Sequence, residues 1–496
     1  MILGILLLAL ILRLINLNQS LWLDEAVQAI TAQKSFFYIF EELRGDFHPP
    51  LYHILMHFWI RFFGGSEISL RIPSVLFGIG TVFIVYLITK ELFREKLIQL
   101  TISNQQLAII SALFMSTAPF HIYYSQEARM YSASCFLVSA SFYYFVRVLK
   151  DDRGWLKDRR GIGYFIFTLM ALYTDYYAVL VVLAQIIAGI IILRKREIVK
   201  LLNCHLALLL FSPIFPLLIS QIKNGMMATQ NLPKWSKLVN LSFFKALPLT
   251  FIKFSIGRIT IFNKNLYAYT VAMLFLVYGL IIFKGFLKDK KLTINKPASR
   301  NSSGMQQLTI ILWFLVPLTI SWLGSLFIPN YQPFHLLLVL PAFYLLLIYG
   351  ISASKTSIIY IIEVVFVLAV NLISSFVYYK NPYFWREDWR GLAKMVKQEN
   401  VPIIISSQTS DWPLVYYGVK DQTIGILPGV GMINQYNQSL LLVKVSDREK
   451  IFYTPYLADL YDPQKLVPKW LGELNFVKIR EVGFNQVPVW EYELKD

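Results

Sequence analysis

Charged residues are scarce in this chain of 496 residues: they make up 16% of it, whereas hydrophobic residues make up 56%. Soluble domains carry about 25% charged residues, so the composition excludes an ordinary soluble protein. Cysteine is also scarce, because Cys135 and Cys204 are the only two, and both lie in or beside apolar runs. They imply no disulfide framework, and they do not identify the redox compartment.

Signatures of several other protein classes are missing. The polar C-terminal part has no Gly-rich phosphate loop and no nucleotide fingerprint. No Cys/His spacing indicates a structural metal, and no internal repeat of the transporter kind is visible. The net charge of +17 would fit a nucleic-acid partner. However, Lys and Arg cluster between apolar runs, so we interpret this charge as loop charge that sets membrane orientation and expect no nucleic acid.

Long apolar runs recur from the N-terminus to about residue 379 and predict a polytopic α-helical membrane protein. The first run lacks a basic start and a small-residue cleavage site, so we expect a retained helix rather than a signal peptide. We count about eleven spans, near 1–17, 70–93, 106–123, 129–149, 162–176, 177–193, 204–221, 266–284, 308–328, 334–350 and 357–378.

The loops between these runs predict an orientation in the cell membrane. Short loops near 122–128, 174–177 and 329–333 carry almost no Lys or Arg, whereas the alternate loops are basic. The positive-inside rule places the basic loops and the N-terminus in the cytoplasm. The loops near 18–68 and 222–265, and everything after 379, then lie outside. Residues of the basic loops include Lys90, Arg94, Lys150, Arg153, Arg194 and Lys296.

The outer parts have their own predicted structure. Within the loop 18–68, the segments 24–42 and 51–63 read as amphipathic helices lying in the membrane interface. After a membrane module over 1–379, the segment 380–496 reads as a small extracytoplasmic α/β domain. It begins with a predicted helix at 386–400, followed by predicted strands at 402–406, 440–445, 450–456, 476–482 and 487–494. The segment 292–305 is polar and reads as a loop.

An acidic pair, Asp24-Glu25, follows the first apolar run by only a few residues. Carboxylates at the mouth of a helical bundle are costly unless they face water or a polar cavity. The pair can cap the helix that it opens, or one carboxylate can act as a general base on a substrate brought by lipid. Taken alone, the pair does not decide between these two interpretations.

The segment Asp46-Phe47-His48-Pro49-Pro50 contains the second candidate. Its two prolines predict a rigid turn that can open the next helix. His48 is then either an ordinary loop residue, or a ligand of a phosphate oxygen or of the acceptor. Asp24, Glu25 and His48 could together bind a divalent cation, although nothing in the sequence requires one.

A very short outer loop contains the third candidate, with Glu127 and Arg129. Arg129 can be a snorkelling arginine at the end of a span. It can equally be a phosphate ligand, because the planar guanidinium fork suits phosphate oxygens. Arg13 and Arg71 are predicted near the same membrane face and can join it. Tyrosines at the outer ends of spans read as an aromatic belt or as a sugar-binding wall: Tyr123, Tyr124, Tyr173, Tyr176 and Tyr177.

Taken in order, these segments resemble the GT-C glycosyltransferases of the protein O-mannosyltransferase type (family 39), with the related aminoarabinose transferases. The resemblance is strongest over about residues 10–150 and says little about the C-terminal domain. The matching segments are Arg13-Leu14, Trp22-Leu23-Asp24-Glu25-Ala26, His48-Pro49-Pro50-Leu51-Tyr52, Leu70-Arg71-Ile72-Pro73-Ser74, Glu127-Ala128-Arg129-Met130-Tyr131, Pro333 with Pro341, and Glu387-Asp388-Trp389-Arg390.

The resemblance implies a polyprenyl-phosphate sugar as donor, a protein, lipid or glycan as acceptor, and an inverting transfer on the outer face. It implies that Asp24 deprotonates the acceptor and that Glu25 supports it. Arg129, with Arg13 and Arg71, is expected to hold the donor phosphate. The residues expected to contact the acceptor or substrate are His48, Glu127 and Tyr131.

This chain departs from the family pattern at one place. Such proteins often have an Arg-Tyr pair before the late Pro-bearing span, whereas this chain has Gln332-Pro333-Phe334-His335. His335 either replaces the arginine as a contact to the donor phosphate, or the contact is absent.

Two alternative functions remain open. An oligosaccharide ligase or polymerase would use a diphosphate-linked glycan, and it is disfavoured because charge concentrates in the first outer loop rather than in a large late one. A transporter of lipid-linked sugar would place charged residues at mid-membrane and show repeats. Glu363 is the main acidic residue inside a predicted span.

Overall fold

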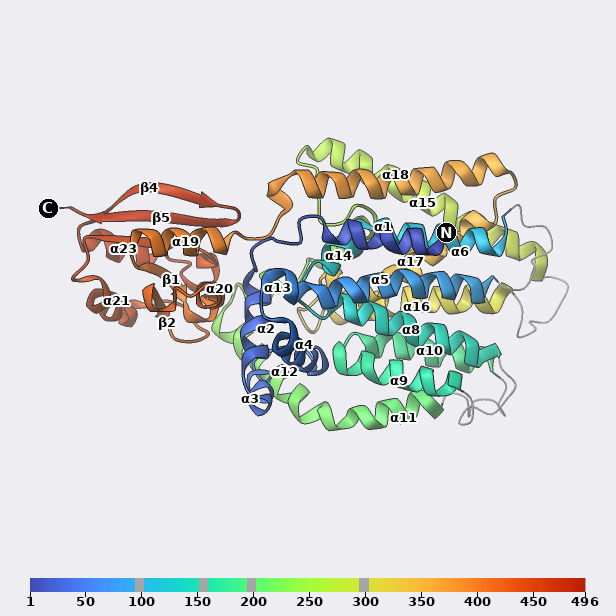
Figure 1. Cartoon of the computed structure of the whole chain (residues 1–496), viewed down its shortest axis with the longest axis horizontal. Helices are drawn as coiled ribbons and strands as arrows, with labels where there is room; N and C mark the ends of the chain where they lie inside the picture. The colour runs from blue at the N-terminus through green and yellow to red at the C-terminus, as the bar shows by residue number, and fades with distance from the viewer. Residues whose placement is uncertain (94–101, 151–158, 194–201, 294–302, 496) are drawn as a thin grey trace.

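The computed structural model describes residues 1–93, 102–150, 159–193, 202–293 and 303–495. It consists of an elongated helical bundle and a smaller α/β domain that contains the C-terminus (Figure 1). The predicted fold class, a polytopic helical protein with a small C-terminal α/β domain, is confirmed. The basic-loop residues Arg94, Arg153, Arg194 and Lys296 lie outside the described residues, as does most of the predicted loop 292–305.

The bundle is formed mainly by helices that run along its length. Among them α8 and α17 lie at the centre, whereas α15 and α18 are largely exposed on the outside. The helices are α1 (Ile2–Leu14), α5 (Glu67–Leu92), α6 (Asn104–Thr117), α7 (Pro119–Ser125), α8 (Tyr131–Lys150), α9 (Arg159–Thr174), α10 (Ala178–Ile192), α11 (Leu202–Phe211), α12 (Phe215–Asn231), α15 (Lys264–Thr293), α16 (Ser303–Gly324), α17 (Leu340–Ser352) and α18 (Ser357–Lys380), with 3₁₀ turns η3 (Ser212–Ile214) and η4 (Pro333–Val339).

Within the described residues, eight helical stretches are long and apolar enough to cross a membrane. The number is nine if α6 and α7, which bend by 58° at their junction, count as one span. The predicted number was about eleven. The difference arises because α1, α9 and α10 have only 13, 16 and 15 residues, although α1 and α10 are apolar.

The segment 222–265 differs from the sequence-based prediction of an outer loop. It contains the end of α12 and the helices α13 (Trp235–Val239) and α14 (Phe243–Ile256). The stretch Trp235–Ile256 is itself apolar enough to count among the eight. Its lysines and Pro248 break up the apolar pattern in the sequence, so the helix signal is weak. In the fold, α14 packs against α7, α16 and α18.

Three short helices lie between the bundle and the C-terminal domain (Figure 1). They are α2 (Leu23–Gln33), α3 (Phe36–Glu42) and α4 (Leu51–Phe63). The predicted helices at 24–42 and 51–63 are confirmed, with a break at Lys34 and Ser35. Phe37 on α3 and Phe62 on α4 are strongly exposed, at 84% and 78%. Exposed aromatics on short helices at one end of a membrane bundle are typical of helices that lie in the interface.

The C-terminal domain has a five-stranded sheet with the order β2-β1-β3-β5-β4. The first three strands are parallel, and β5 is antiparallel to both β3 and β4. The strands are β1 (Ile403–Ser407), β2 (Thr423–Leu427), β3 (Lys450–Thr454), β4 (Phe476–Phe484) and β5 (Val487–Leu494); the helices are α19 (Trp389–Glu399), α20 (Trp412–Tyr416), α21 (Gln438–Val445), α22 (Ala458–Tyr461) and α23 (Leu466–Glu473), with short 3₁₀ turns η5 (Pro382–Phe384), η6 (Gln408–Ser410), η7 (Lys420–Gln422) and η8 (Gln435–Asn437).

Four of the five predicted strands of this domain are confirmed, and one is wrong. The run 440–445 belongs to helix α21, because Leu441 and Val445, four residues apart, pack together against the sheet. Strand β2 was not predicted. The central strand β1 is buried on both faces: Ile403 and Ile405 pack with Trp389 of α19, whereas Ile404 packs on the opposite side.

Candidate functional site

The acidic pair lies in the first turn of α2. Trp22 is the N-cap residue of this helix and makes no side-chain capping bond. Asp24 and Glu25 are the second and third helical residues, so neither carboxylate caps the helix. Both remain favoured there by the positive end of the helix dipole. The interpretation of the pair as a helix cap is therefore wrong.

Glu25 is fully buried, and both of its carboxylate oxygens accept hydrogen bonds. Its Oε1 accepts hydrogen bonds from Arg71 Nε and from the backbone N–H of Ala128, both at 2.8 Å. Its Oε2 accepts a hydrogen bond from Arg71 Nη2 at 2.5 Å and lies 3.8 Å from Arg386 Nε. Burial alone would raise the pKa of Glu25, but Arg71 and Arg386 outweigh it and lower the pKa below the ordinary value. Glu25 is therefore an anchor that is ionised at neutral pH.

Asp24 has the opposite environment. Its side chain keeps 36% of its surface exposed, and its ion-pair partner is Arg129, with 3.7 Å between Nη2 and Oδ2. Burial of the site raises the pKa of Asp24 above the ordinary value, and Arg129 works against this rise. A carboxylate with an open oxygen and a raised pKa can accept a proton. Of the two acids, the geometry suits Asp24 to the role of a base.

Arg129 lies in the turn 126–130 between α7 and α8 and is only 4% exposed. Ser74 Oγ donates to its backbone oxygen at 3.2 Å. Within the described part of the chain, the guanidinium has the long contact to Asp24, and its Nε is buried without a hydrogen-bond partner. A buried cation with unused donors is suited to an anion such as phosphate.

The two other predicted phosphate-binding arginines are bound to protein. Arg71 donates to Glu25 and to the backbone oxygens of Leu17, Gln19 and Ser20. Arg13 donates to Ala9, Met115 and Ser116 backbone oxygens and contacts His121 Nδ1 at 2.7 Å. These bonds fix α1 and α5 around the site and leave few donors for a ligand. The phosphate-binding role of both residues stays a prediction.

The turn before α4 and the first turn of that helix bring three titratable side chains close together. Asp46 Oδ2 lies 3.1 Å from His53 Nε2, and Asp46 Oδ1 lies 4.0 Å from His48 Nε2. Burial holds the pKa of His48 well below its ordinary value, so its imidazole is neutral at pH 7. As predicted, the proline pair opens α4, with Pro50 as its N-cap residue. The sequence-based prediction assigns no role in the site to Asp46 or His53.

Aromatic rings connect His48 to the late span. The His48 ring lies 6.4 Å from that of Tyr131, which lies 5.4 Å from Tyr124 and 5.3 Å from Phe334. Phe334 contacts His335 at 4.5 Å. The structure thus brings His48, Tyr131 and His335 into one wall of rings, which is compatible with the sugar-binding wall considered from the sequence.

Two further arginines were missed as site residues. Arg258, just after α14, donates to Tyr124 Oη at 3.2 Å and lies over the Tyr123 ring, and the residue is partly exposed to solvent. Arg386, between α18 and α19, pairs with Glu127 at 2.8 Å. Both lie far along the chain from Asp24 and Arg129, so no local sequence pattern connects them to the site. The family pattern covers only Glu387-Asp388-Trp389-Arg390 and not the preceding Arg386.

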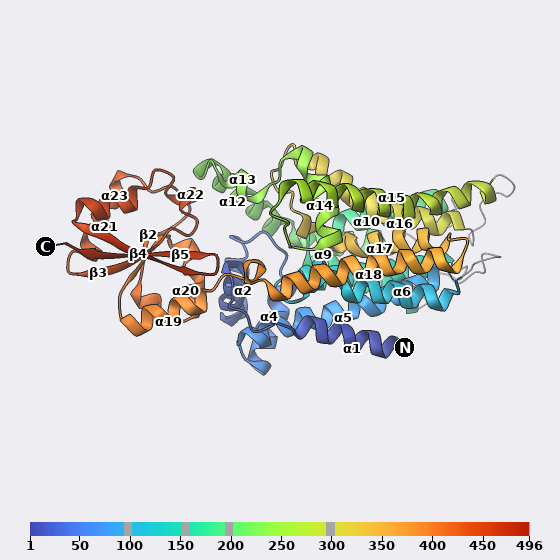
Figure 2. The same ribbon diagram turned by 90° about the horizontal axis from the view of Figure 1, so that it is seen from above.

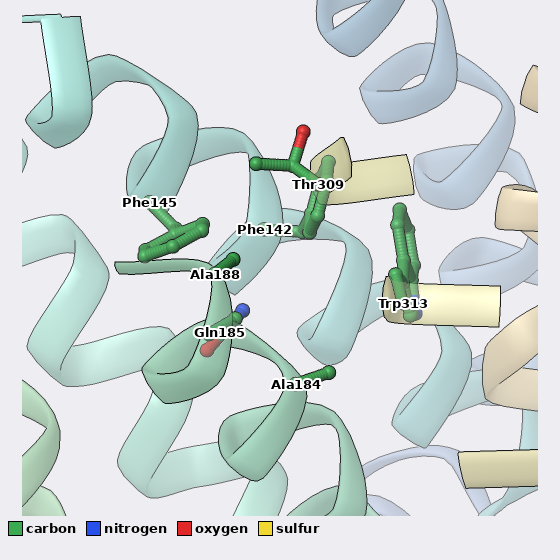
Figure 3. Close-up of a pocket in the computed structure, with 7 residues that line it drawn as sticks. All are labelled: Phe142, Phe145, Ala184, Gln185, Ala188, Thr309 and Trp313. Atoms are coloured by element: carbon green, nitrogen blue, oxygen red, sulfur yellow. The ribbon is translucent and has the colours of Figure 1, made fainter. Parts of the chain in front are cut away.

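No group of three or more His, Cys, Asp or Glu side chains in the described ranges is arranged to hold a metal ion. The cation considered near Asp24, Glu25 and His48 does not fit, because arginines already saturate Glu25. Figure 3 shows a gap elsewhere, between α8, α10 and α16, lined by Phe142, Gln185 and Trp313 among others. It leaves no room for a water molecule, and the Gln185 amide is bonded to Tyr164 and Ser141.

A helical bundle with short helices and an acid at its mouth, continued by a small α/β domain, is the architecture expected of the GT-C fold. Residues 47–219 match the model of a family described as dolichyl-phosphate-mannose-protein mannosyltransferase. The comparison with curated proteins found no match. The resemblance to GT-C membrane glycosyltransferases is confirmed by this match together with the fold.

Two solved structures share the fold over nearly the whole chain. ArnT from Cupriavidus metallidurans, bound to undecaprenyl phosphate, aligns with a TM-score of 0.54 at 12% identity, covering 99% of this chain and 97% of its own. The Archaeoglobus fulgidus oligosaccharyltransferase, in complex with zinc and sulfate, aligns with a TM-score of 0.50 at 12% identity, covering 98% of this chain and 73% of its own. At these identities the likeness concerns the fold.

Proposed function

We propose that this protein is an inverting glycosyltransferase that moves a sugar from a polyprenyl-phosphate donor to a protein, lipid or glycan acceptor on the extracytoplasmic face of the cell membrane. The observation that carries the proposal is the pairing of Asp24, a partly exposed carboxylate, with Arg129, a buried guanidinium with unused donors. The first can take a proton, and the second can hold a phosphate, within one site.

The proposed reaction is a single displacement at the anomeric carbon of the donor. Asp24 takes the proton of the acceptor group as the acceptor atom forms its bond to the anomeric carbon. The bond between that carbon and the phosphate oxygen breaks, and the electron pair leaves with the polyprenyl phosphate. Arg129 stabilises the charge that develops on the leaving phosphate. A single displacement needs no covalent sugar–enzyme intermediate and inverts the anomeric configuration.

The other site residues take supporting roles in this proposal. Arg258 contacts Tyr124 and His335 contacts Phe334 of the aromatic wall. In this proposal both residues contact the donor phosphate together with Arg129. The neutral imidazole of His48 lies beside the ring of Tyr131, and in this proposal both contact the sugar or the acceptor. Glu25 and Arg71 hold the first turn of α2, and with it Asp24, in place.

The donor class is supported by the fold neighbour ArnT, whose structure contains undecaprenyl phosphate. A lipid carrier also fits a site at the end of a membrane bundle. We assign the chemistry to the module 1–379 and a role in acceptor binding to the domain 380–496, whose sheet directs the carboxyl ends of its parallel strands towards α2 (Figures 1 and 2). Ligands of open α/β sheets commonly bind at that edge.

A donor screen with the purified full-length protein tests the proposal. It would offer undecaprenyl-phosphate and undecaprenyl-diphosphate monosaccharides with cell-envelope extract as acceptor, and follow release of the lipid phosphate. We expect turnover of a monophosphate donor, and Asp24→Asn should reduce kcat by about 10²-fold or more, with unchanged thermal stability. Turnover of the diphosphate donors alone would overturn the donor class, and full activity of Asp24→Asn would overturn the base.

A further inference from the structure

Arg386 is a buried arginine near the site that has no role in the proposed reaction. It lies in the link between α18 and α19, far along the chain from Asp24, yet its side chain is 2% exposed. Its backbone is held from both sides. Its N–H donates to Gln19 Oε1 at 2.8 Å, and its carbonyl oxygen accepts from Asn485 Nδ2, in the β4–β5 turn, at 2.9 Å.

The guanidinium of Arg386 closes the C-terminal end of α7. Its Nη2 donates to the backbone oxygens of Tyr123 and Gln126 at 3.3 and 3.1 Å, and the group lies 4.6 Å above the Tyr123 ring. Its Nη1 donates to Glu127 Oε2 at 2.8 Å. Arginine is favoured at such carbonyls because they are the negative end of the helix. Arg386 thus binds the turn 126–130 at its first two residues.

The same turn is also bound by Glu25, which accepts the N–H of Ala128. Glu25 is paired in turn with Arg71 and lies near Arg386. Two buried acids, Glu25 and Glu127, are therefore balanced by two buried arginines, Arg71 and Arg386. The turn 126–130, which Glu25 and Arg386 both bind, contains Arg129 and therefore sets the distance between Arg129 and Asp24.

We propose that Arg386 is a positioning residue for the active site: by neutralising Glu127 and holding the end of α7, it fixes the turn that presents Arg129 to Asp24 and to the donor phosphate. The C-terminal domain is then a structural part of the active site, because its β4–β5 turn holds Arg386. This inference rests on the proposed function for what Arg129 binds, but the geometry of the turn stands without it.

Loss of the Arg386 charge should have a specific signature. Arg386→Gln leaves Glu127 buried without a counter-ion, so the turn should move, and a buried unpaired charge is strongly unfavourable. We expect the Kd for undecaprenyl phosphate to rise roughly tenfold or more. Amide hydrogen exchange should quicken in residues 123–131. The acidic limb of the pH profile of kcat/KM should move up by about one pH unit, because Arg129 no longer lowers the pKa of Asp24.

Two variants distinguish positioning from general damage. Arg390→Gln removes an arginine in the first turn of α19 that contacts Glu67 and Asn18 and is partly exposed, and it should leave all three readouts unchanged. The double variant Arg386→Gln/Glu127→Gln removes the unpaired acid, and it should recover most of the loss, as coupled residues do in a double-mutant cycle.

The experiment uses the full-length protein in detergent, with undecaprenyl phosphate as the binding probe. Equal losses in Arg386→Gln and Arg390→Gln, or no recovery in the double variant, would overturn the proposal in favour of simple domain docking. If the unaltered protein fails to bind undecaprenyl phosphate, the proposed donor is wrong, and the hydrogen-exchange comparison alone still decides whether Arg386 holds the turn.

Discussion

At the scale of single residues, the neighbouring carboxylates of Asp24 and Glu25 differ in their environment and in the direction of their pKa shifts. Glu25 is surrounded by donors and ionised, whereas Asp24 has an open face and a raised pKa. Their difference arises from α2, which turns successive residues about 100° apart, so one side chain points into the buried arginines and the other towards the mouth of the site. Adjacent residues of the same type can therefore be separated by experiment.

The first prediction concerns the pH dependence of activity. A base must be deprotonated to work, and burial raises the pKa of Asp24 above 3.8. The acidic limb of kcat/KM should therefore lie above pH 3.8, with activity lost as the pH falls through the limb. Arg129→Gln should move the limb further up, because Arg129 lowers this pKa. A pH profile of each variant measures the shift, and a downward shift in Arg129→Gln would contradict the assignment.

The second prediction concerns stability. Glu25→Gln removes the partner of a buried arginine, and such a change costs about 3–5 kcal/mol. The variant should unfold at a clearly lower temperature in detergent. Its matched control is Glu42→Gln, which breaks a half-exposed pair with Lys34 and should cost no more than about 1 kcal/mol. Equal thermal stability of the two variants would show that Glu25 is not the anchor described above.

At the scale of elements, the site depends on close packing between α5 and α7. Gly78 on α5 lies so near α7 that a Cβ atom there would meet Ser125 Cβ and Arg13 Nε at 2.9 Å. Only a residue without a side chain lets the two helices approach this closely. The end of α7 leads directly into the turn that carries Arg129, so the spacing of these helices is transmitted to the site.

The third prediction follows from this contact. Gly78→Ala should force α5 and α7 apart, destabilise the protein by about 1–3 kcal/mol and reduce activity more than thermal stability alone explains. Gly279→Ala on α15 is the control, because nothing lies within 4 Å of its added Cβ, and it should be neutral or slightly stabilising. Thermal unfolding and donor turnover of both variants give the comparison.

Elements were predictable from sequence where one local pattern dominates. The helix Leu51–Phe63 follows a proline pair and has a regular apolar face, so its bounds could be read directly. By contrast, the run 440–445 is apolar at nearly every position, which fits a buried strand or a buried helix equally. For the site, Asp24 was predictable from its place after the first span, whereas the partners that separate it from Glu25 come from distant segments.

At the scale of the whole molecule, the N-terminus and the C-terminal domain lie towards opposite ends of the bundle (Figure 1). The basic helix end at Lys150 is bonded to Glu91 of α5, and both α5 and α8 run from the end near α2–α4 to the other end. Arg386, before α19, contacts α7, and Arg390, in the first turn of α19, contacts the segment after α1. Site and C-terminal domain therefore share one side, as the loop charges predicted.

The fourth prediction is the absolute orientation, in which the site and the C-terminal domain face outward. It is testable with single cysteines in a background in which Cys135 and Cys204 are replaced. Tyr436→Cys lies in the C-terminal domain at a position that is 91% exposed, and Ser357→Cys lies at the exposed start of α18, at the opposite end (Figure 1).

An impermeant maleimide should label Tyr436→Cys in intact cells and Ser357→Cys only after permeabilisation. The physical reason is that short basic loops resist translocation, and the basic ends lie on the side of Ser357. The reverse pattern would place Asp24 on the cytoplasmic side, where a sugar nucleotide rather than a flipped lipid donor would be the accessible sugar source. Labelling therefore tests the donor class by a route that does not depend on any assay of transfer.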